Sequence, residues 1–134
     1  LDGVVTILDS VKGVESQTLK VWAQATKQKI PKICFLNKMD RLGANAHNGI
    51  KSLRDKLHHN AVLMQLPIGA EDDFKGIIDL IRMRAFYFEG SNGENLKEED
   101  IPADLRDDAI LARDFLVEQI ANADDLLAEK YLDG

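Results

Sequence analysis

Residues 33–40 read ICFLNKMD and join an apolar run directly to a polar cluster. Four consecutive apolar residues are typical of a short strand that is buried on both faces of a parallel sheet. Open α/β sheets bind their ligands in the crevice beyond the carboxyl ends of such strands. Because Asn37, Lys38 and Asp40 follow the run at once, the sequence predicts a ligand site at this point of the chain.

The polar cluster has the chemistry that a guanine base requires. The Asp40 carboxylate can accept hydrogen bonds from the ring N1–H and the exocyclic amine of guanine, and adenine offers neither donor on that edge. Asn37 can bond the base edge and brace the neighbouring loop, while the Lys38 stem can lie along the flat face of the base. A site that hydrogen-bonds its substrate rejects analogues without those groups by roughly 10⁴–10⁵-fold. We therefore predict that Asn37, Lys38 and Asp40 bind guanine; the alternative is a solvated turn after a strand.

The first half of the chain predicts an α/β fold. A second buried strand is expected over residues 3–9, a helix over 16–29, the strand that ends in the polar cluster over 32–37, and another helix over 44–58. Strand, helix and strand at this spacing form a βαβ unit with a parallel pair. The core faces that the helical spacing predicts are Leu19, Trp22, Ala23 and Thr26 in the first helix, and Ala46, Ile50, Leu53 and Leu57 in the second.

The second half predicts a small α+β unit. Its β-rich segments are residues 61–68 and 77–88, a strong turn follows at 90–93, and residues 94–100 are charged and expected to be exposed. Helices are expected over 104–122 and 124–132.

Net charge divides the chain in the same way. Residues 1–60 hold ten Lys or Arg and five Asp or Glu, whereas residues 61–134 hold seven and eighteen, so the net charges are +5 and −11. This asymmetry indicates two modules with different partners, the acidic one suited to a basic protein and poorly suited to nucleic acid.

The longer of the two predicted helices in the acidic half has two different faces. Leu105, Ala109, Ala112, Leu116 and Ile120 recur at helical spacing and are expected to face the sheet of their own unit. On another side the spacing groups Asp107, Leu111, Asp114 and Glu118 into an acidic stripe with one apolar residue. The simplest interpretation of this stripe is a solvated face.

Machinery for phosphate chemistry is absent from the sequence. No Gly-x-x-x-x-Gly-Lys-Ser/Thr loop occurs, so no segment could cradle the β- and γ-phosphates. We expect no catalytic residue, no metal ligand and no GTPase activity in this chain alone. Asp9 could be an active-site carboxylate by position, but a turn cap before Gly13 is favoured. Asp72 and Asp73 suggest a solvated turn more economically than a metal loop.

Taken together, these motifs resemble the elongation factor G family of translational GTPases. The similar stretches are residues 1–3, 13–18, 33–43, 65–69, 74–80 and 101–104. The resemblance implies that residues 1–57 are the later part of a P-loop-type GTP-binding domain and residues 58–134 most of its insertion (G-prime) subdomain. It implies a fragment of a larger protein, consistent with a chain that opens on LDG without Met. The intact protein would bind GTP or GDP with Mg²⁺, whose ligands lie outside this chain.

The resemblance also implies partners and a compartment. A ribosome-dependent factor that drives translocation would use the insertion to contact the basic C-terminal domain of the ribosomal stalk protein, and we expect Asp107, Leu111, Asp114 and Glu118 to take part. No membrane segment and no sequence-specific nucleic-acid contact are expected. The protein is expected to be soluble, in the bacterial cytoplasm or the mitochondrial matrix.

Two alternatives remain open at this level. Residues 57–61 and 87–94 are similar to the mitochondrial translocase and its bacterial relatives, whereas residues 31–36 also fit the mitochondrial recycling paralogue, which splits ribosomes. In a different class of function, the chain would be a stand-alone acidic protein-binding module whose guanine motif is vestigial.

Overall fold

The computed structural model describes residues 1–133 and divides the chain into two compact units. The first comprises Leu1–Ala61 together with the short segment Ala70–Phe74, and the second comprises Val62–Gly69 and the residues from Lys75 on. The first holds a parallel pair of strands and the second an antiparallel sheet, which confirms the α/β class and the separate small unit.

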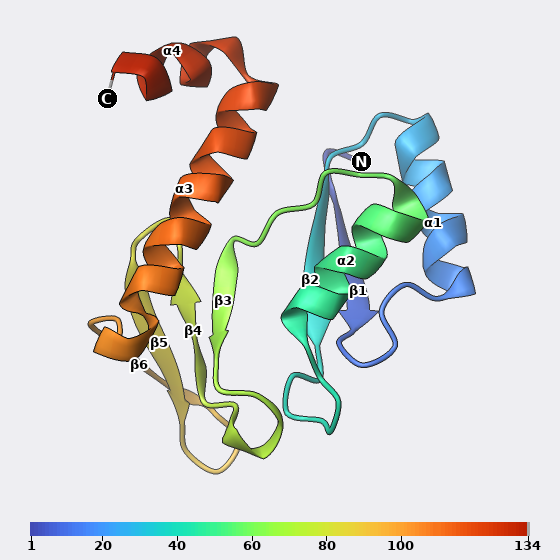
Figure 1. Cartoon of the computed structure of the whole chain (residues 1–134). Coiled ribbons are helices and arrows are strands. Elements are labelled where there is room, and N and C mark those ends of the chain that lie inside the picture. The colour runs from blue at the N-terminus through green and yellow to red at the C-terminus, as the bar shows by residue number, and fades with distance from the viewer. Residues whose placement is uncertain (134) are drawn as a thin grey trace. The chain divides into compact units, whose positions relative to one another are not determined.

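The first unit is a strand–helix–strand–helix arrangement (Figure 1). Its elements are β1 (Val4–Asp9), α1 (Ser16–Lys27), β2 (Lys32–Asn37) and α2 (Ala46–Leu57). The strands pair in parallel, with Asp9 opposite Asn37 at their carboxyl ends. The Asn45 carboxamide caps α2 by accepting hydrogen bonds from the backbone N–H groups of His47 and Asn48, because the first N–H groups of a helix lack intrahelical partners.

Both helices of this unit pack on one face of the strand pair. Leu8, Val14, Trp22 and Leu53 form the core there, and the predicted face of α2 is buried or half-buried throughout. The predicted buried face of α1 is wrong. Trp22 and Ala25 are buried, so the true face is rotated about the helix axis from the predicted one. Of the other predicted residues, Leu19 is 42% exposed, and Ala23 and Thr26 are exposed. Leu19 lines an open hollow beside α1, so its apolar side chain lies outside the core.

The opposite face of the strand pair is open to solvent. The exposed fractions are 66% for Val5, 66% for Ile7, 59% for Ile33 and 57% for Phe35. The expectation of burial on both faces is therefore wrong for this chain, because α1 and α2 lie together on the Leu8 side. The alternating side chains of each strand divide cleanly between these two faces.

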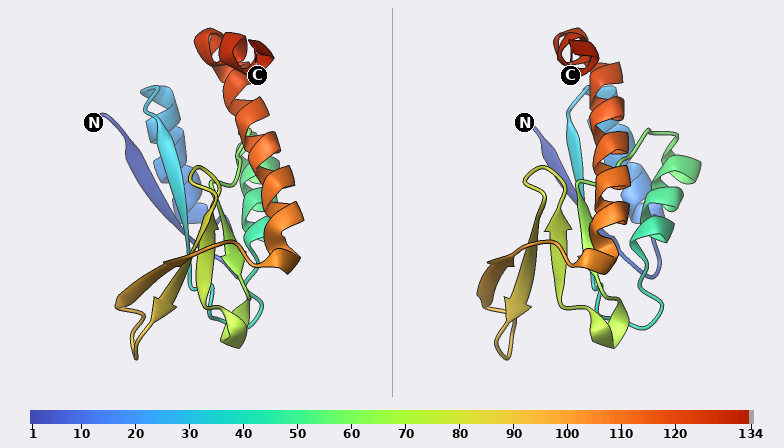
Figure 2. Two further views of the ribbon diagram at one scale, coloured as in Figure 1. Left: turned by 90° about the vertical axis from the view of Figure 1, so that its left-hand side faces the viewer. Right: turned by 60° about the vertical axis from the view of Figure 1, so that its left-hand side comes forward.

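The second unit is a four-stranded antiparallel sheet in the order β3–β4–β5–β6, with two helices after it (Figures 1 and 2). The strands are β3 (Gln65–Ile68), β4 (Gly76–Asp79), β5 (Arg84–Glu89) and β6 (Asn95–Glu99), and the helices are α3 (Arg106–Ala123) and α4 (Asp125–Asp133), with a 3₁₀ turn, η2 (Ala103–Leu105), before α3.

Two predictions for the sheet need correction. The single β-rich run over 77–88 is two strands, because Asp79 Oδ1 accepts hydrogen bonds from the N–H groups of Ile81 and Arg82 and turns the chain. The charged segment after the 90–93 turn is exposed as expected, but it forms β6. Cross-strand ion pairs replace apolar side chains there, among them Arg84 with Glu98.

Helix α3 contributes its predicted apolar face to the core of the second unit. Ala109 and Leu116 are buried against Ile78, Leu80 and other core residues. The Arg113 guanidinium donates hydrogen bonds to the carbonyl oxygens of Leu80 and Ile81 at 2.5 and 2.7 Å, which fixes the helix to the β4–β5 turn. Ile120 is 40% exposed instead of buried and Ala121 is buried in its place, near the end of a helix that also contacts α4.

Candidate guanine-binding site

The predicted guanine loop begins where β2 ends. Asn37 is the last residue of the strand, and Lys38 adopts a left-handed backbone with φ of 64°, so the chain turns sharply after the strand. Asn37 Oδ1 accepts a hydrogen bond from the Lys38 N–H at 2.9 Å, a local bond that stabilises this turn. The loop therefore leaves the sheet edge with its three polar residues in one short turn.

The Lys38 side chain is anchored by Asp9 at the end of the neighbouring strand. Its Nζ lies 2.7 Å from Asp9 Oδ2, while Asp9 Oδ1 accepts hydrogen bonds from the N–H groups of Val11 and Lys12 at 2.9 and 3.2 Å. The turn-capping role of Asp9 is confirmed, but its pairing with Lys38 was missed. The parallel register, which sets Asp9 beside Asn37, is the signal that could have revealed it.

This anchoring also sets the charge of Asp9. The Lys38 ammonium, followed by the N–H groups of Val11 and Lys12, holds the pKa of the Asp9 carboxyl well below its ordinary value. Asp9 is therefore ionised at neutral pH. The pair stabilises the fold above the ordinary carboxyl pKa, and this contribution is lost as the pH falls toward the lowered value. A fixed ammonium in turn holds the Lys38 stem beside the loop.

Ser10 supports the backbone of the same loop. Its side chain is almost fully buried, its Oγ donates to the Lys38 carbonyl oxygen at 2.8 Å, and its N–H donates to the Asn37 carbonyl oxygen at 3.0 Å. Such a buried hydroxyl with a satisfied partner fixes local geometry. Sequence reasoning missed Ser10, although it follows Asp9 directly at the strand end.

Asp40 points away from the core. Met39 is 9% exposed and anchors the loop inward, whereas Asp40 is exposed. The Arg41 N–H closes the turn on the Lys38 carbonyl oxygen at 3.1 Å, and the Ala44 N–H follows on the Arg41 carbonyl oxygen at 3.0 Å. An exposed carboxylate on a braced turn can accept two donors from a planar ligand.

A second contact to this loop comes from far along the chain. The 3₁₀ turn η1 (Glu71–Asp73) belongs to the first unit, and Glu71 bonds the backbone at Met39 and Gly43. Sequence reasoning treated this acidic segment only as a solvated turn. No local pattern could have revealed the contact, since about thirty residues separate the partners.

The acidic stripe lies on the exposed side of α3. Asp107, Leu111, Asp114 and Glu118 are all exposed, and Leu111 is 68% exposed, whereas Ala109 and Leu116 face the core of the second unit. The stripe is therefore accessible in this unit, as both a solvated face and a binding face would be.

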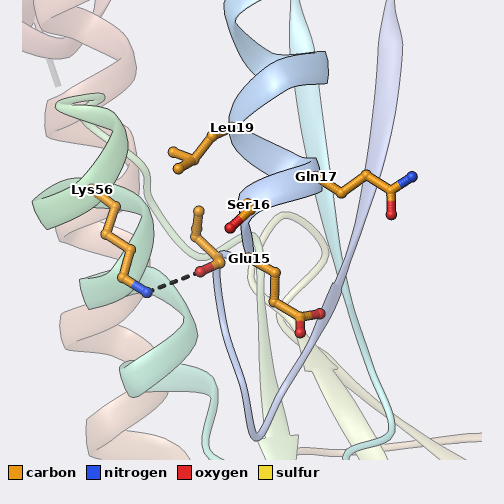
Figure 3. A pocket seen from close by; sticks show the side chains of 6 residues that line it. Glu15, Ser16, Gln17, Leu19 and Lys56 are labelled. Atoms are coloured by element: carbon orange, nitrogen blue, oxygen red, sulfur yellow. Dashed lines mark hydrogen bonds between the residues drawn. The ribbon is translucent and has the colours of Figure 1, made fainter.

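An open hollow of about 540 Å³ lies beside the first turn of α1 and is lined by Val14, Glu15, Ser16, Gln17, Leu19 and Lys56. Lys56 Nζ donates to the Val14 carbonyl oxygen at 2.9 Å across it (Figure 3). None of these residues belongs to the guanine loop, so the hollow does not extend that site.

Two kinds of feature are absent from the described residues 1–133. No helix in this range is long and apolar enough to cross a membrane. Within the same range, no group of three or more His, Cys, Asp or Glu side chains is placed to hold a metal ion.

The chain is similar to a known protein family and to a solved structure. The sequence model of the family described as the elongation factor Tu GTP binding domain matches residues 1–125. A crystal structure of a protein from Thermus thermophilus matches with a TM-score of 0.83 and 25% sequence identity. That match covers 99% of this chain and 19% of the Thermus chain, so this chain spans about a fifth of the length of that solved relative.

Proposed function

Because this chain belongs to the family of elongation factor Tu GTP-binding domains, we propose that it supplies the guanine-recognition loop of a ribosome-dependent GTPase that catalyses translocation. The observation that supports guanine recognition is the braced turn at the end of β2, with Lys38 Nζ 2.7 Å from Asp9 Oδ2 and Asp40 exposed beside it. Residues 1–57 would then be the later part of the GTP-binding domain, and residues 58–134 most of its insertion.

The three loop residues would divide the work of recognition. Asp40 accepts the N1–H and the exocyclic amine of guanine, the anchored Lys38 stem covers one face of the base, and Asn37 holds the turn through its bond to the Lys38 N–H. Since the sequence contains no phosphate loop, the groups that hold the GTP phosphates and Mg²⁺ are assigned to other parts of the protein.

The translocation proposal is tested with the complete protein and programmed ribosomes. With GTP, we expect the protein to advance the mRNA by one codon, measured as a shift in the position at which reverse transcription stops. Dissociation of ribosomal subunits without such a shift would favour the recycling alternative. The absence of both activities and of ribosome-stimulated GTP hydrolysis would favour a stand-alone acidic binding module.

We also propose that the exposed stripe on α3 binds the ribosomal stalk. Asp107, Asp114 and Glu118 present carboxylates around the 68%-exposed Leu111, and residues 61–134 carry a net charge of −11. Such a surface suits the basic C-terminal domain of the stalk protein. Opposite charges across a contact chiefly raise the association rate, and salt screens this effect.

Reversing Asp107, Asp114 and Glu118 together to Lys is expected to slow association with the stalk domain by about tenfold or more at low salt. Guanine-nucleotide affinity should stay unchanged, since these residues belong to the second unit and the guanine loop to the first. Stopped-flow binding and ribosome-stimulated GTP hydrolysis by the complete protein measure the two effects.

The matched control reverses three exposed acidic residues of α4, namely Asp125, Glu129 and Asp133, and changes the net charge equally. If both triple variants slow association with the stalk domain equally, the slowing is caused by net charge and not by the α3 stripe. If neither the α3 triple variant nor added salt alters stalk binding, the stripe is only solvated.

A further inference from the structure

The short segment Ala70–Phe74 connects two strands of the second unit but belongs to the first. It contains the 3₁₀ turn η1, in which Glu71 adopts a left-handed backbone with φ of 55°. A residue other than glycine takes this conformation infrequently, and surrounding contacts are needed to keep it there. The Glu71 carbonyl oxygen accepts a hydrogen bond from the Phe74 N–H within its own turn, and two further hydrogen bonds join Glu71 to the guanine loop, residues 37–43.

Glu71 makes two hydrogen bonds that bracket Asp40 in the sequence. Its N–H donates to the carbonyl oxygen of Met39 at 3.2 Å, just before Asp40. Its Oε1 accepts the N–H of Gly43 at 2.7 Å, three residues after Asp40. A carboxylate that accepts a backbone N–H makes a shorter and stronger bond than a neutral acceptor does. The turn that carries Asp40 is thus fixed on both sides by one residue.

The contact is specific to Glu71 within its acidic segment. Glu71 is half-buried, whereas Asp72 and Asp73 are exposed. Gly43, which donates its N–H to the Glu71 carboxylate, has a left-handed φ of 84°, a conformation that glycine adopts without steric cost. Like Lys38 with Asp9 on the strand side, Glu71 with Gly43 fixes the loop on the far side.

We propose that Glu71 is a positioning residue for guanine recognition: it fixes the Met39–Gly43 turn so that the Asp40 carboxylate is held ready for the base. This inference rests on the proposed role of Asn37, Lys38 and Asp40. The segment Ala70–Phe74 would then contribute to nucleotide selectivity without contacting the nucleotide.

The test measures the dissociation constants of GDP and inosine diphosphate for the complete protein. Inosine lacks the exocyclic amine, so the ratio of the two constants reports how well Asp40 is placed. We expect Glu71→Ala to weaken GDP binding by about tenfold and to bring the ratio close to one. Glu71→Gln keeps an acceptor oxygen and should restore most of the ratio, and Asp72→Ala, the matched control, should leave both constants unchanged.

Asp40→Asn, measured in parallel, distinguishes failure of the positioning role of Glu71 from failure of the proposed guanine-binding role of Asp40. If Asp40→Asn weakens GDP binding but Glu71→Ala leaves both the affinity and the ratio at their original values, the positioning role is overturned and the guanine assignment stands. A Glu71→Ala protein that has lost thermal stability but retains the original ratio also overturns the positioning role. If Asp40→Asn itself leaves GDP binding unchanged, the proposed function fails together with the inference.

Discussion

Replacing Asp40 by Asn in the complete protein is expected to turn a guanine-selective site into a xanthine-selective one. The carboxylate can accept both donors of the guanine edge, whereas the Asn side chain offers one acceptor and one donor. Xanthine carries a carbonyl where guanine carries an amine, so the new donor finds a partner. Loss of hydrogen bonds to a charged group should weaken GDP binding by about 1.5–3 kcal/mol or more.

The substitution is well suited to isolating base recognition. Asp40 is exposed, and Asn has nearly the same shape, so the fold should be unaffected. Equilibrium titrations with GDP and xanthosine diphosphate give the two affinities. Asp55→Asn, an exposed carboxylate on α2, serves as the control and should bind both nucleotides as the original protein does. Unweakened GDP binding in the Asp40 variant would contradict the assignment.

The largest expected effect on stability follows from Gly76→Ala in the second unit. Gly76 is buried and lies opposite Tyr87 where β4 pairs with β5. An added Cβ would lie 2.2 Å from the Phe86 carbonyl oxygen and 3.0 Å from the Tyr87 Cα. Both are backbone atoms of the neighbouring strand, so only separation of the strands could relieve the clash. We expect a loss of about 3 kcal/mol in the unfolding free energy of this unit.

The intrinsic chromophores allow each unit to be followed separately. The single tryptophan, Trp22, lies in the first unit, and both tyrosines, Tyr87 and Tyr131, lie in the second. In urea, Gly76→Ala should shift the tyrosine-detected transition to lower concentration and leave the tryptophan-detected one in place. Gly3→Ala is the control, because its added Cβ would lie 3.8 Å from the nearest atom, the Pro31 carbonyl oxygen. An unshifted tyrosine transition would refute the predicted clash.

Elements of the fold could be predicted from the sequence where the spacing of apolar residues matches the period of a helix or a strand. The strand that ends at Asn37 has the predicted bounds, although one of its faces is exposed. The predicted face of α2 is buried or half-buried, because its apolar spacing matches helical geometry. The β6 strand lacks that signal, since ion pairs such as Arg84 with Glu98 stabilise its pairing. In α1, apolar Leu19 near the start of the helix favoured a face one residue away from the true one.

In the candidate site, the loop residues could be predicted from the sequence, whereas the contacts that support them could not. Asn37, Lys38 and Asp40 are close enough in sequence to be recognised from their types and spacing. Their supports are long-range: Asp9 contacts Lys38 through the parallel register, and Glu71 bonds Gly43 although helix α2 and strand β3 separate them in the sequence. The first could be inferred once the strands are paired, whereas the second depends on the path of a loop that no periodicity describes.

The most direct test of guanine reading by this loop is a high-resolution crystal structure of the complete protein with GDP bound. It should place the two carboxylate oxygens of Asp40 at about 2.7–3.0 Å from N1 and the exocyclic amine nitrogen of the base. The Lys38 stem should lie against one face of the ring. A bound guanine whose N1 edge is recognised by residues other than Asp40 would contradict the account.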